Sequence, residues 1–168
     1  MTISMYAASV PVFKRSLAGL AAILDKAHAH CANHNISESA LLQARLFPDM
    51  FTFAKQVQVA CDFAKSGVAR LAGVEPPRFE DNEQTLLELK LRVEKTIACI
   101  ETFTAAQIDG AETRQIAYMM GKFPIDMPGQ TYLLGFILPN FFFHYTTAYN
   151  LLRHNGLPIG KRDFMGPA

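Results

Sequence analysis

Apolar residues recur three and four positions apart in four long stretches of the chain, the spacing that gathers them on one face of an α-helix. Residues that favour helix ends accompany this pattern. Ser37 and Asp49 are suited to begin helices, and Asn155 followed by Gly156 is suited to end one. Long helices are therefore predicted at residues 5–33, 49–72, 82–103 and 129–155, with a short helix at residues 37–47.

One stretch, residues 114–129, departs from the helical spacing. Apolar side chains occupy every second position on both sides of Gly121 and Lys122, which is the pattern of two strands joined by a tight turn. These apolar positions are Ile116, Tyr118, Met120, Phe123, Ile125 and Met127. The whole pattern predicts an all-α fold: one domain over residues 1–168, a four-helix bundle with a short β-hairpin between the third and fourth long helices. The tail at residues 156–166 is expected to be extended and to pack back on the bundle.

The composition fits a folded domain with a substantial core. Half of the 168 residues are hydrophobic, 18% are charged and the formal net charge is +1. Because Lys and Arg form no block, no nucleic-acid partner is predicted. The most hydrophobic window, residues 132–143, would span only about 18 Å as a helix, so no membrane partner is predicted either. With no secretory signal pattern at its beginning, the chain is expected to be a soluble cytoplasmic protein.

Two histidines stand in the apolar last helix. At 100° per residue from Leu134, His144 lies about 80° away, at the edge of the core face, whereas His154 lies about 160° away and points to solvent. They are about 15 Å apart along the helix axis, so they cannot share a metal ion. The residues expected on the core face are Leu134, Ile137, Leu138, Phe141, Tyr145, Ala148 and Leu152. On spacing alone, the favoured interpretation of His144 is a boundary histidine that forms a hydrogen bond with a neighbouring helix, and a functional role is the alternative.

Other metal-ligating residues are dispersed. His30 and His34 share a helix face, but a metal site would need a third ligand, and solvated histidines near a helix end are the favoured interpretation. The three cysteines, Cys31, Cys61 and Cys99, lie far apart, as a reducing compartment permits. We expect all three to be structural, with Cys31 the most accessible because it lies near a helix end.

A polar pair borders the apolar stripe of the second long helix. Gln58 and Asp62 are one turn apart, where their side chains either reach a pocket between helices or are simply solvated. The chain has no nucleophile elbow, no phosphate-binding loop and no close pair of carboxylates on a predicted core face. No motif therefore specifies a reaction.

Four phrases of the sequence resemble the DinB-like superfamily, and in particular one of its branches, a domain of unknown function. They are SMYAASVPVF, RLFPDMFTFAKQVQVACDFAK, PNFFFHYTTAYNLLRHNG and IGKRDF, and together they span nearly the whole chain. The resemblance implies a helical bundle with a hairpin before the last helix. Many members of this superfamily bind a divalent metal through three histidines, one on the second helix and two a turn apart on the last. Characterised relatives include thiol-dependent transferases and isomerases.

This chain departs from that metal-binding pattern. Its second long helix carries Gln56 and Gln58 where a histidine is expected, and its last helix offers His144 alone in the matching region. Amide oxygens replace imidazole poorly at a transition-metal site. No metal cofactor is therefore expected, and a divalent metal is kept only as an alternative.

Two kinds of function are compatible with these features. In the preferred one, an inter-helix pocket centred on His144 as the catalytic group binds or transforms an unknown small molecule. The residues expected to orient this ligand are Gln58, Asp62, Asn140 and Tyr149. In the other, the protein is a non-catalytic homodimer that buries the Phe136 and Phe143 side of the last helix, and dimerisation through this helix is expected in either case. A divalent-metal-dependent thiol transferase stays an alternative if a metal site survives.

Overall fold

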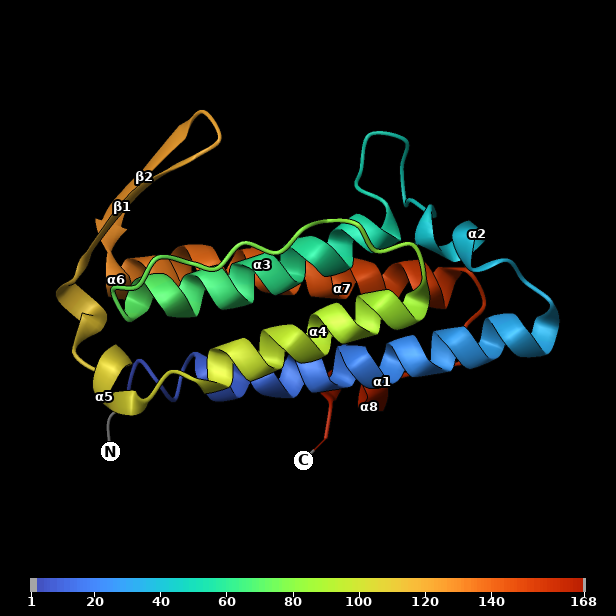
Figure 1. The fold of residues 1–168 in the computed structure, drawn as a ribbon, viewed down its shortest axis with the longest axis horizontal. Coiled ribbons are helices and arrows are strands. Elements are labelled where there is room, and N and C mark those ends of the chain that lie inside the picture. Colours follow the sequence, from blue (N-terminus) through green and yellow to red (C-terminus); the bar gives the residue numbers. More distant parts are fainter. Residues whose placement is uncertain (1–2, 168) are drawn as a thin grey trace.

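The computed structural model describes residues 3–167 and is built on four long helices in two layers. α1 (Val10–His34) packs against α4 (Leu86–Glu101), and α3 (Phe53–Leu71) packs against α7 (Leu138–His154). Contacts between α3 and α4 join the two layers. Figure 1 shows each pair lying antiparallel along the long axis of the molecule. The predicted all-α bundle is confirmed.

Shorter elements connect or extend the four long helices. The predicted hairpin is confirmed: Met120 pairs with Phe123 across the turn at Gly121, whose φ of 61° suits a glycine. Figure 1 shows this hairpin projecting from one end of the bundle. The shorter elements are α2 (Glu38–Leu42), α5 (Ala105–Ile108), the 3₁₀ turn η1 (Ala111–Thr113), β1 (Gln115–Met120), β2 (Phe123–Pro128), α6 (Gly129–Thr131), the π-helical turn η2 (Tyr132–Ile137) and α8 (Lys161–Met165).

A long crossover, residues 72–85, connects α3 to α4 and determines the topology. Figure 1 shows it leaving the end of α3 and running back along the bundle, so that α4 points in the same direction as α3. Neighbouring helices that run parallel need such a connection. Each long helix therefore has its main antiparallel partner far away in the sequence.

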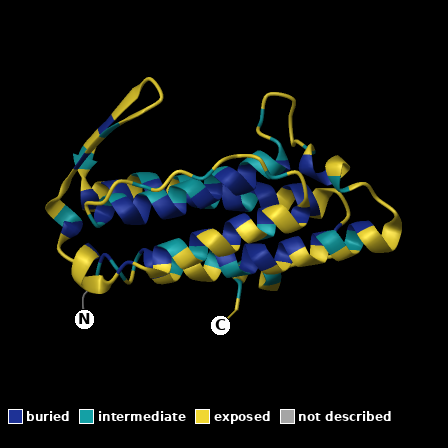
Figure 2. Cartoon of the chain, viewed as in Figure 1, coloured by how far each residue is buried: buried dark blue, intermediate teal, exposed yellow. Residues whose placement is uncertain are grey.

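An apolar core fills the space between the layers. Figure 2 shows buried positions facing the interior and exposed ones on the outer faces, with the hairpin largely exposed. Gly67 lets α3 approach the last helix closely, because a Cβ at this position would overlap Ile137. Fully buried large side chains come from all four long helices and include Phe13, Leu17, Phe53, Leu89, Phe141 and Tyr145. Within residues 3–167, none of the helices combines the length and the apolarity needed to traverse a bilayer.

The structure shifts the ends of three predicted helices. α1 begins at Val10 and not at residue 5, and α2 ends at Leu42 and not at residue 47. α3 begins after Thr52, whose hydroxyl accepts the Lys55 N–H at 3.3 Å, rather than after Asp49. Threonine and aspartate offer the same capping chemistry three residues apart, so the local sequence alone does not separate them.

α4 begins at Leu86, four residues later than predicted. Thr85 accepts the Glu88 N–H at 3.1 Å while the Glu88 carboxylate accepts the Thr85 N–H at 3.0 Å, a reciprocal capping box. Glu38 of α2 accepts the Leu86 N–H at 2.8 Å. The start of α4 is therefore fixed both from within the helix and by a side chain from another part of the chain.

The π-helical turn changes which side chains of the last helix face the core. α6, η2 and α7 run as one continuous helix, and Pro139 has no N–H to bond back to the preceding turn. The Asn140 amide instead donates to the Phe136 carbonyl at 2.7 Å. Leu133 and Leu134 lie within this wider turn, whose residues are rotated relative to an ideal α-helix, so Leu133 is buried and Leu134 is 50% exposed. The prediction that Leu134 lies on the core face is wrong.

The tail packs back on the bundle but forms a short helix, α8, where an extended segment was predicted. The Asp163 carboxylate accepts the Gly160 N–H at 2.7 Å, which caps this helix, and also pairs with Lys26 of α1 at 2.5 Å. Tyr145 of α7 donates its hydroxyl hydrogen to the Phe164 carbonyl at 2.5 Å. These contacts hold α8 against both α1 and α7.

A buried charge cluster attaches the 72–85 crossover to the bundle. The Arg92 side chain on α4 is 2% exposed, and its guanidinium donates to the Glu80 carbonyl at 2.8 Å. It also pairs with three carboxylates: Asp81 at 2.8 Å, Glu83 at 2.9 Å and Asp62 at 3.1 Å. Since Asp62 belongs to α3 and the other acceptors belong to the crossover, one arginine connects three segments.

Side chains of α3 complete this cluster. They are Lys65 at 2.8 Å from Asp62, Lys55 at 2.5 Å from Asp81, and Gln58, whose amide donates to Glu83 at 2.8 Å. A buried guanidinium is costly unless its charge is matched nearby, and here carboxylates surround it. The cluster therefore holds the crossover in place as long as its charges stay balanced.

Arg92→Met is expected to lower the free energy of unfolding by about 3 kcal/mol, because it leaves partly buried carboxylates without their cation. Urea denaturation at neutral pH, followed by circular dichroism, measures this loss. Arg162→Met on the exposed surface of α8 is the matched control and should change stability by less than about 0.5 kcal/mol. Equal stabilities of the two variants would contradict the role given to the cluster.

Candidate functional site

His144 lies on α7 where this helix packs against the first turns of α3. The residue is 8% exposed, and its Nδ1 lies 2.6 Å from Oε1 of Gln56. The predicted hydrogen bond between this histidine and a neighbouring helix is confirmed. Its partner is Gln56, whereas the prediction placed Gln58 in the pocket.

The Gln56 amide determines which nitrogen of His144 carries the hydrogen. Its Nε2 donates to the Phe51 carbonyl at 3.5 Å, which orients Oε1 as the acceptor toward the imidazole. A carbonyl acceptor at 2.6 Å requires Nδ1 of His144 to be the donor. In the neutral imidazole, Nε2 then has a lone pair and no hydrogen.

Aromatic rings surround the imidazole. Phe51 and Phe63 stack nearly parallel to it at centroid distances of 6.2 Å and 5.7 Å, and Phe143 meets it edge-on at 5.2 Å. Within residues 3–167, Arg92 Nε is the one fully buried side-chain nitrogen or oxygen that lacks a hydrogen-bond partner. His144 Nε2 also lacks a hydrogen-bond partner among these residues, yet it is not one of the fully buried atoms. It therefore keeps some contact with solvent.

Burial lowers the pKa of the His144 imidazole from its ordinary value, because loss of water disfavours the charged form. The side chain is therefore neutral at pH 7. A neutral imidazole whose Nδ1–H is held by an amide can accept a hydrogen bond or a proton at Nε2.

The metal site implied by the family resemblance does not fit these residues. The α3 side chain that faces His144 is Gln56, which binds Nδ1 as a hydrogen-bond acceptor. In the part of the chain that the structure describes, no three His, Cys, Asp or Glu side chains gather closely enough to hold a metal ion. A structural or catalytic zinc needs three or four protein ligands, and one imidazole does not provide them.

Gln58 and Asp62, both predicted to orient a ligand at His144, belong to the Arg92 cluster. Gln58 donates to Glu83, and Asp62 pairs with Arg92 and Lys65. Their contacts are thus with α4, the crossover and Lys65 of α3 itself.

The two predicted ligand residues of α7 also have other contacts. Asn140 donates to the Phe136 carbonyl of its own helix. The Tyr149 ring meets Phe164 of α8 edge-on at a centroid distance of 5.6 Å. The contacts given by the structure therefore do not assemble the four predicted residues around His144.

The cysteines differ from expectation in their accessibility. Cys31 and Cys61 are buried, whereas Cys99 is partly exposed, so the expectation that Cys31 is the most accessible is wrong. Although Cys31 lies near the end of α1, it continues the core face on which Leu24 and Ala27 lie. Burial raises the pKa of all three thiols, that of Cys61 to about 12. All three side chains are therefore in the weakly reactive thiol form.

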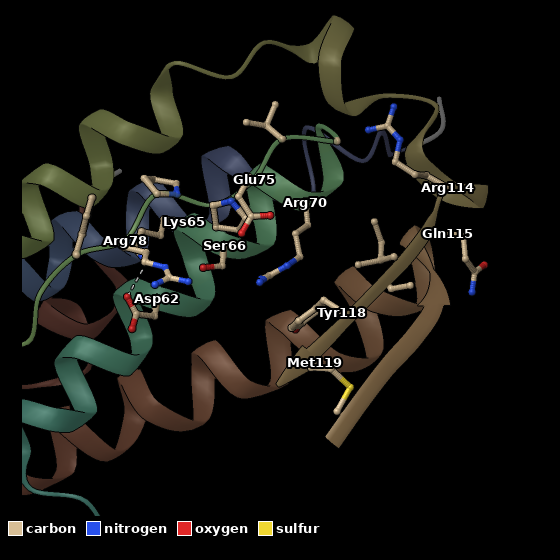
Figure 3. A pocket seen from close by; sticks show the side chains of 17 residues that line it. Asp62, Lys65, Ser66, Arg70, Glu75, Arg78, Arg114, Gln115, Tyr118 and Met119 are labelled. Atoms are coloured by element: carbon tan, nitrogen blue, oxygen red, sulfur yellow. Dashed lines mark ion pairs between the residues drawn. The ribbon is translucent and has the colours of Figure 1, made fainter. Parts of the chain in front are cut away.

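A cleft of about 620 Å³ opens elsewhere, between α3, residues 73–79 of the crossover, and β1. An adjoining space of about 370 Å³ lies between α3, the hairpin and Ile137. Figure 3 shows Arg70 extending from α3 toward Tyr118 on β1. The residues that line both spaces are Asp62, Ser66, Arg70, Tyr118 and Met119.

Arg70 and Tyr118 form the contact between these two spaces. The guanidinium carbon of Arg70 lies 3.7 Å from the centroid of the Tyr118 ring. Of the predicted site residues, Asp62 alone lines this cleft. Sequence reasoning did not single out Arg70 or Tyr118, because their contact depends on where the hairpin folds against α3.

Comparison with known proteins identifies the family. A family described as "Domain of unknown function (DUF1993)" matches residues 5–165. The chain is also similar to a DinB family member protein from Shewanella denitrificans, whose crystal structure superposes with a TM-score of 0.90 at 40% identity, over 97% of this chain and 92% of that chain. The chain belongs to the DinB family. Among curated proteins, none matches it significantly.

The DinB resemblance expected from the sequence phrases is thereby confirmed, together with the bundle and hairpin that it implied. In this DinB family protein, Gln56 lies on the helix where the resemblance predicted a metal-binding histidine. Its amide oxygen forms the hydrogen bond with Nδ1 of His144.

The stability of this DinB family protein is expected to decrease when His144 becomes protonated. Burial lowers the folded-state pKa of His144, so between that value and the unfolded value of about 6.5 the unfolded chain binds more protons. This contribution to stability is present above pH 6.5 and is lost as the pH falls through the window.

Urea denaturation at a series of pH values between 7.5 and 5 measures this dependence. His144→Gln is expected to reduce the loss of stability on acidification, whereas the matched control His154→Gln, at the exposed end of α7, should leave it unchanged. Identical pH dependence in the wild type and His144→Gln would contradict the expectation.

Proposed function

We propose that this DinB family protein binds a small molecule at His144 without a metal, using the neutral imidazole as a hydrogen-bond acceptor. The observation that carries this proposal is the 2.6 Å bond from Nδ1 to Gln56 Oε1, which fixes the ring and leaves the Nε2 lone pair available. Where the bound group is acidic enough, the same nitrogen can remove its proton as a general base.

The chemistry around His144 indicates the kind of ligand. Because Nε2 can only accept, a molecule that donates an N–H or O–H hydrogen is the matching partner. Phe63 and Phe51 offer flat apolar faces near the imidazole, which favour a planar ring in the ligand. Phe51 is 48% exposed, so little packing is lost when its ring turns aside to admit a molecule.

Phenol and indole are suitable probes, because each combines a planar ring with one hydrogen donor, while toluene lacks the donor. Phenol is expected to shift the ¹⁵N resonance of His144 Nε2 in a long-range ¹H–¹⁵N spectrum, and toluene is not. His144→Phe keeps a planar ring and removes the hydrogen-bond acceptor, so its affinity for phenol should be at least about five-fold lower. His154→Phe is the matched control and should behave as the wild type.

Equal binding of phenol to the wild type and His144→Phe would refute the proposal. So would about one transition metal per chain in protein purified without chelator or metal-affinity resin, if His144→Phe lost that metal. Elemental analysis of the same preparations gives this second result.

A homodimer formed through the last helix is a second proposal, favoured by the exposure of apolar side chains there. Phe143 is 56% exposed and Leu134 is 50% exposed. Phe136, the other residue of the predicted contact, is partly buried within its own chain, where it stacks on Tyr132 at 5.9 Å and meets Phe63 edge-on at 6.0 Å. Phe143 is therefore the better residue with which to test association.

Phe143→Glu is expected to turn a dimeric wild type into a folded monomer, because it places a charge in the apolar contact. Sedimentation velocity over a range of concentrations measures the assembly state. Leu91→Glu, at a 62% exposed position on α4, is the matched control and should remain dimeric. A wild type that sediments as a monomer at all concentrations rules out this assembly.

A further inference from the structure

We propose that the cleft between α3, residues 73–79 and β1 binds a small amphipathic anion. The charged head of this molecule would lie at Arg70, and its apolar part would fill the adjoining space beside Phe63 and Ile137. This second site does not contain His144, although Phe63 borders both. It does not depend on the proposal made for His144.

Arg70 is the cation that lines both parts of the cleft. Among the ion pairs between residues 3–167, none includes Arg70. Its guanidinium instead lies over the Tyr118 ring at 3.7 Å, and one N–H donates to the Tyr132 hydroxyl at 3.4 Å. A guanidinium has five N–H donors in a rigid plane, so most of them stay available to a bound anion.

Tyr132, beside Arg70, does not neutralise it. Burial raises the pKa of Tyr132, so its hydroxyl stays neutral. That hydroxyl accepts from Arg70 and donates to the Tyr118 hydroxyl at 3.5 Å, which forms a chain of three polar groups. This series of hydrogen bonds orients the guanidinium, but the neutral Tyr132 hydroxyl does not compensate its positive charge.

The larger part of the cleft carries an excess of positive charge. Lys65 is matched by Asp62 at 2.8 Å. The remaining charged residues that line this part are three cations and one anion: Arg70, Arg78 and Arg114, and Glu75. Figure 3 shows these side chains around the opening, with Ser66 one turn before Arg70 on α3. Three guanidinium groups and one carboxylate favour an anionic ligand.

The adjoining space has the opposite character. It is lined mainly by the apolar side chains of Val59, Phe63, Met119, Met120 and Ile137. The two methionines belong to the hairpin, and their flexible side chains can adapt to ligands of different shape. An apolar group that enters this space is removed from water on the α3 side and on the hairpin side.

The two halves together determine the class of ligand. A carboxylate or phosphate forms charge-assisted, bidentate hydrogen bonds with arginine, and both therefore match the head position. A neutral apolar molecule would leave Arg70 unmatched, and a small inorganic anion would leave the apolar space unfilled. A medium-length chain or a small ring attached to one anionic group satisfies both halves.

Isothermal titration of the full chain with octanoate tests this site. Octanoate is expected to bind at one site per chain and at least about ten-fold more tightly than octanol or acetate, which lack the charge or the chain. Octyl phosphate is titrated in parallel. Tighter binding of octyl phosphate would assign a phosphate head, tighter binding of octanoate a carboxylate head, and binding of neither would overturn the proposal.

Arg70→Gln is expected to weaken the binding of the preferred amphiphile about ten-fold. Arg78→Gln changes an exposed side chain of the crossover and should weaken it about three-fold, which gives a test that does not depend on how the hairpin packs. Arg162→Gln on α8 is the matched control and should bind as the wild type does. Unchanged affinity in both Arg70→Gln and Arg78→Gln would overturn the proposal.

Two further variants separate this site from its alternatives. Met119→Glu, at a 62% exposed position of the hairpin, places a charge beside the apolar space and should weaken binding of octanoate at least as much as Arg78→Gln does. His144→Phe should bind octanoate as the wild type does. Loss of binding in His144→Phe would assign octanoate to the other site and refute the one proposed here.

Discussion

The burial of one guanidinium, that of Arg92, constrains much of this structure. A charge removed from water has to be matched nearby, and the matching carboxylates come from α3 and from the crossover. The crossover is thereby held along the outside of the bundle, where its residues 73–79 form one wall of the cleft at Arg70. Asp62 takes part in both the cluster and the cleft, so the charge balance of one affects the other.

Most of the fold could be predicted because its signals are local. Helical spacing marks the long helices, and the alternation around Gly121 marks the hairpin. The failures occur where the helix geometry changes or where contacts come from elsewhere. Leu134 was assigned to the core on the assumption of a constant 100° per residue, which the π-helical turn before Pro139 interrupts. The start of α4 depends on Glu38, which no local pattern connects with Leu86.

The candidate site was less predictable because its partners are distant in the sequence. The spacing placed His144 at the edge of the core, but its partner, Gln56, lies 88 residues away and becomes adjacent only when α3 packs against α7. Gln58 was expected in the same pocket, yet the buried charge of Arg92 engages the polar groups on its side of α3. Periodicity along one helix shows which face a residue occupies, but not which neighbouring side chain forms a hydrogen bond with it. The contact of Arg70 with the hairpin was not predicted for the same reason, because it joins residues that are distant in the sequence.

The parallel arrangement of α3 and α4 has a consequence for how the chain folds. α1 finds its main partner in α4, and α3 finds its main partner in α7, so the principal helix pairs join distant segments. The entropy of closing these long loops has to be overcome before the pairs can form, which slows folding relative to a bundle of consecutive helical hairpins. During synthesis, the apolar faces of α1 and α3 would emerge well before the helices that cover them. The folding of the first half of the chain therefore depends on the second half. Until the second half has been synthesised, the first half is the part most exposed to aggregation or to capture by chaperones.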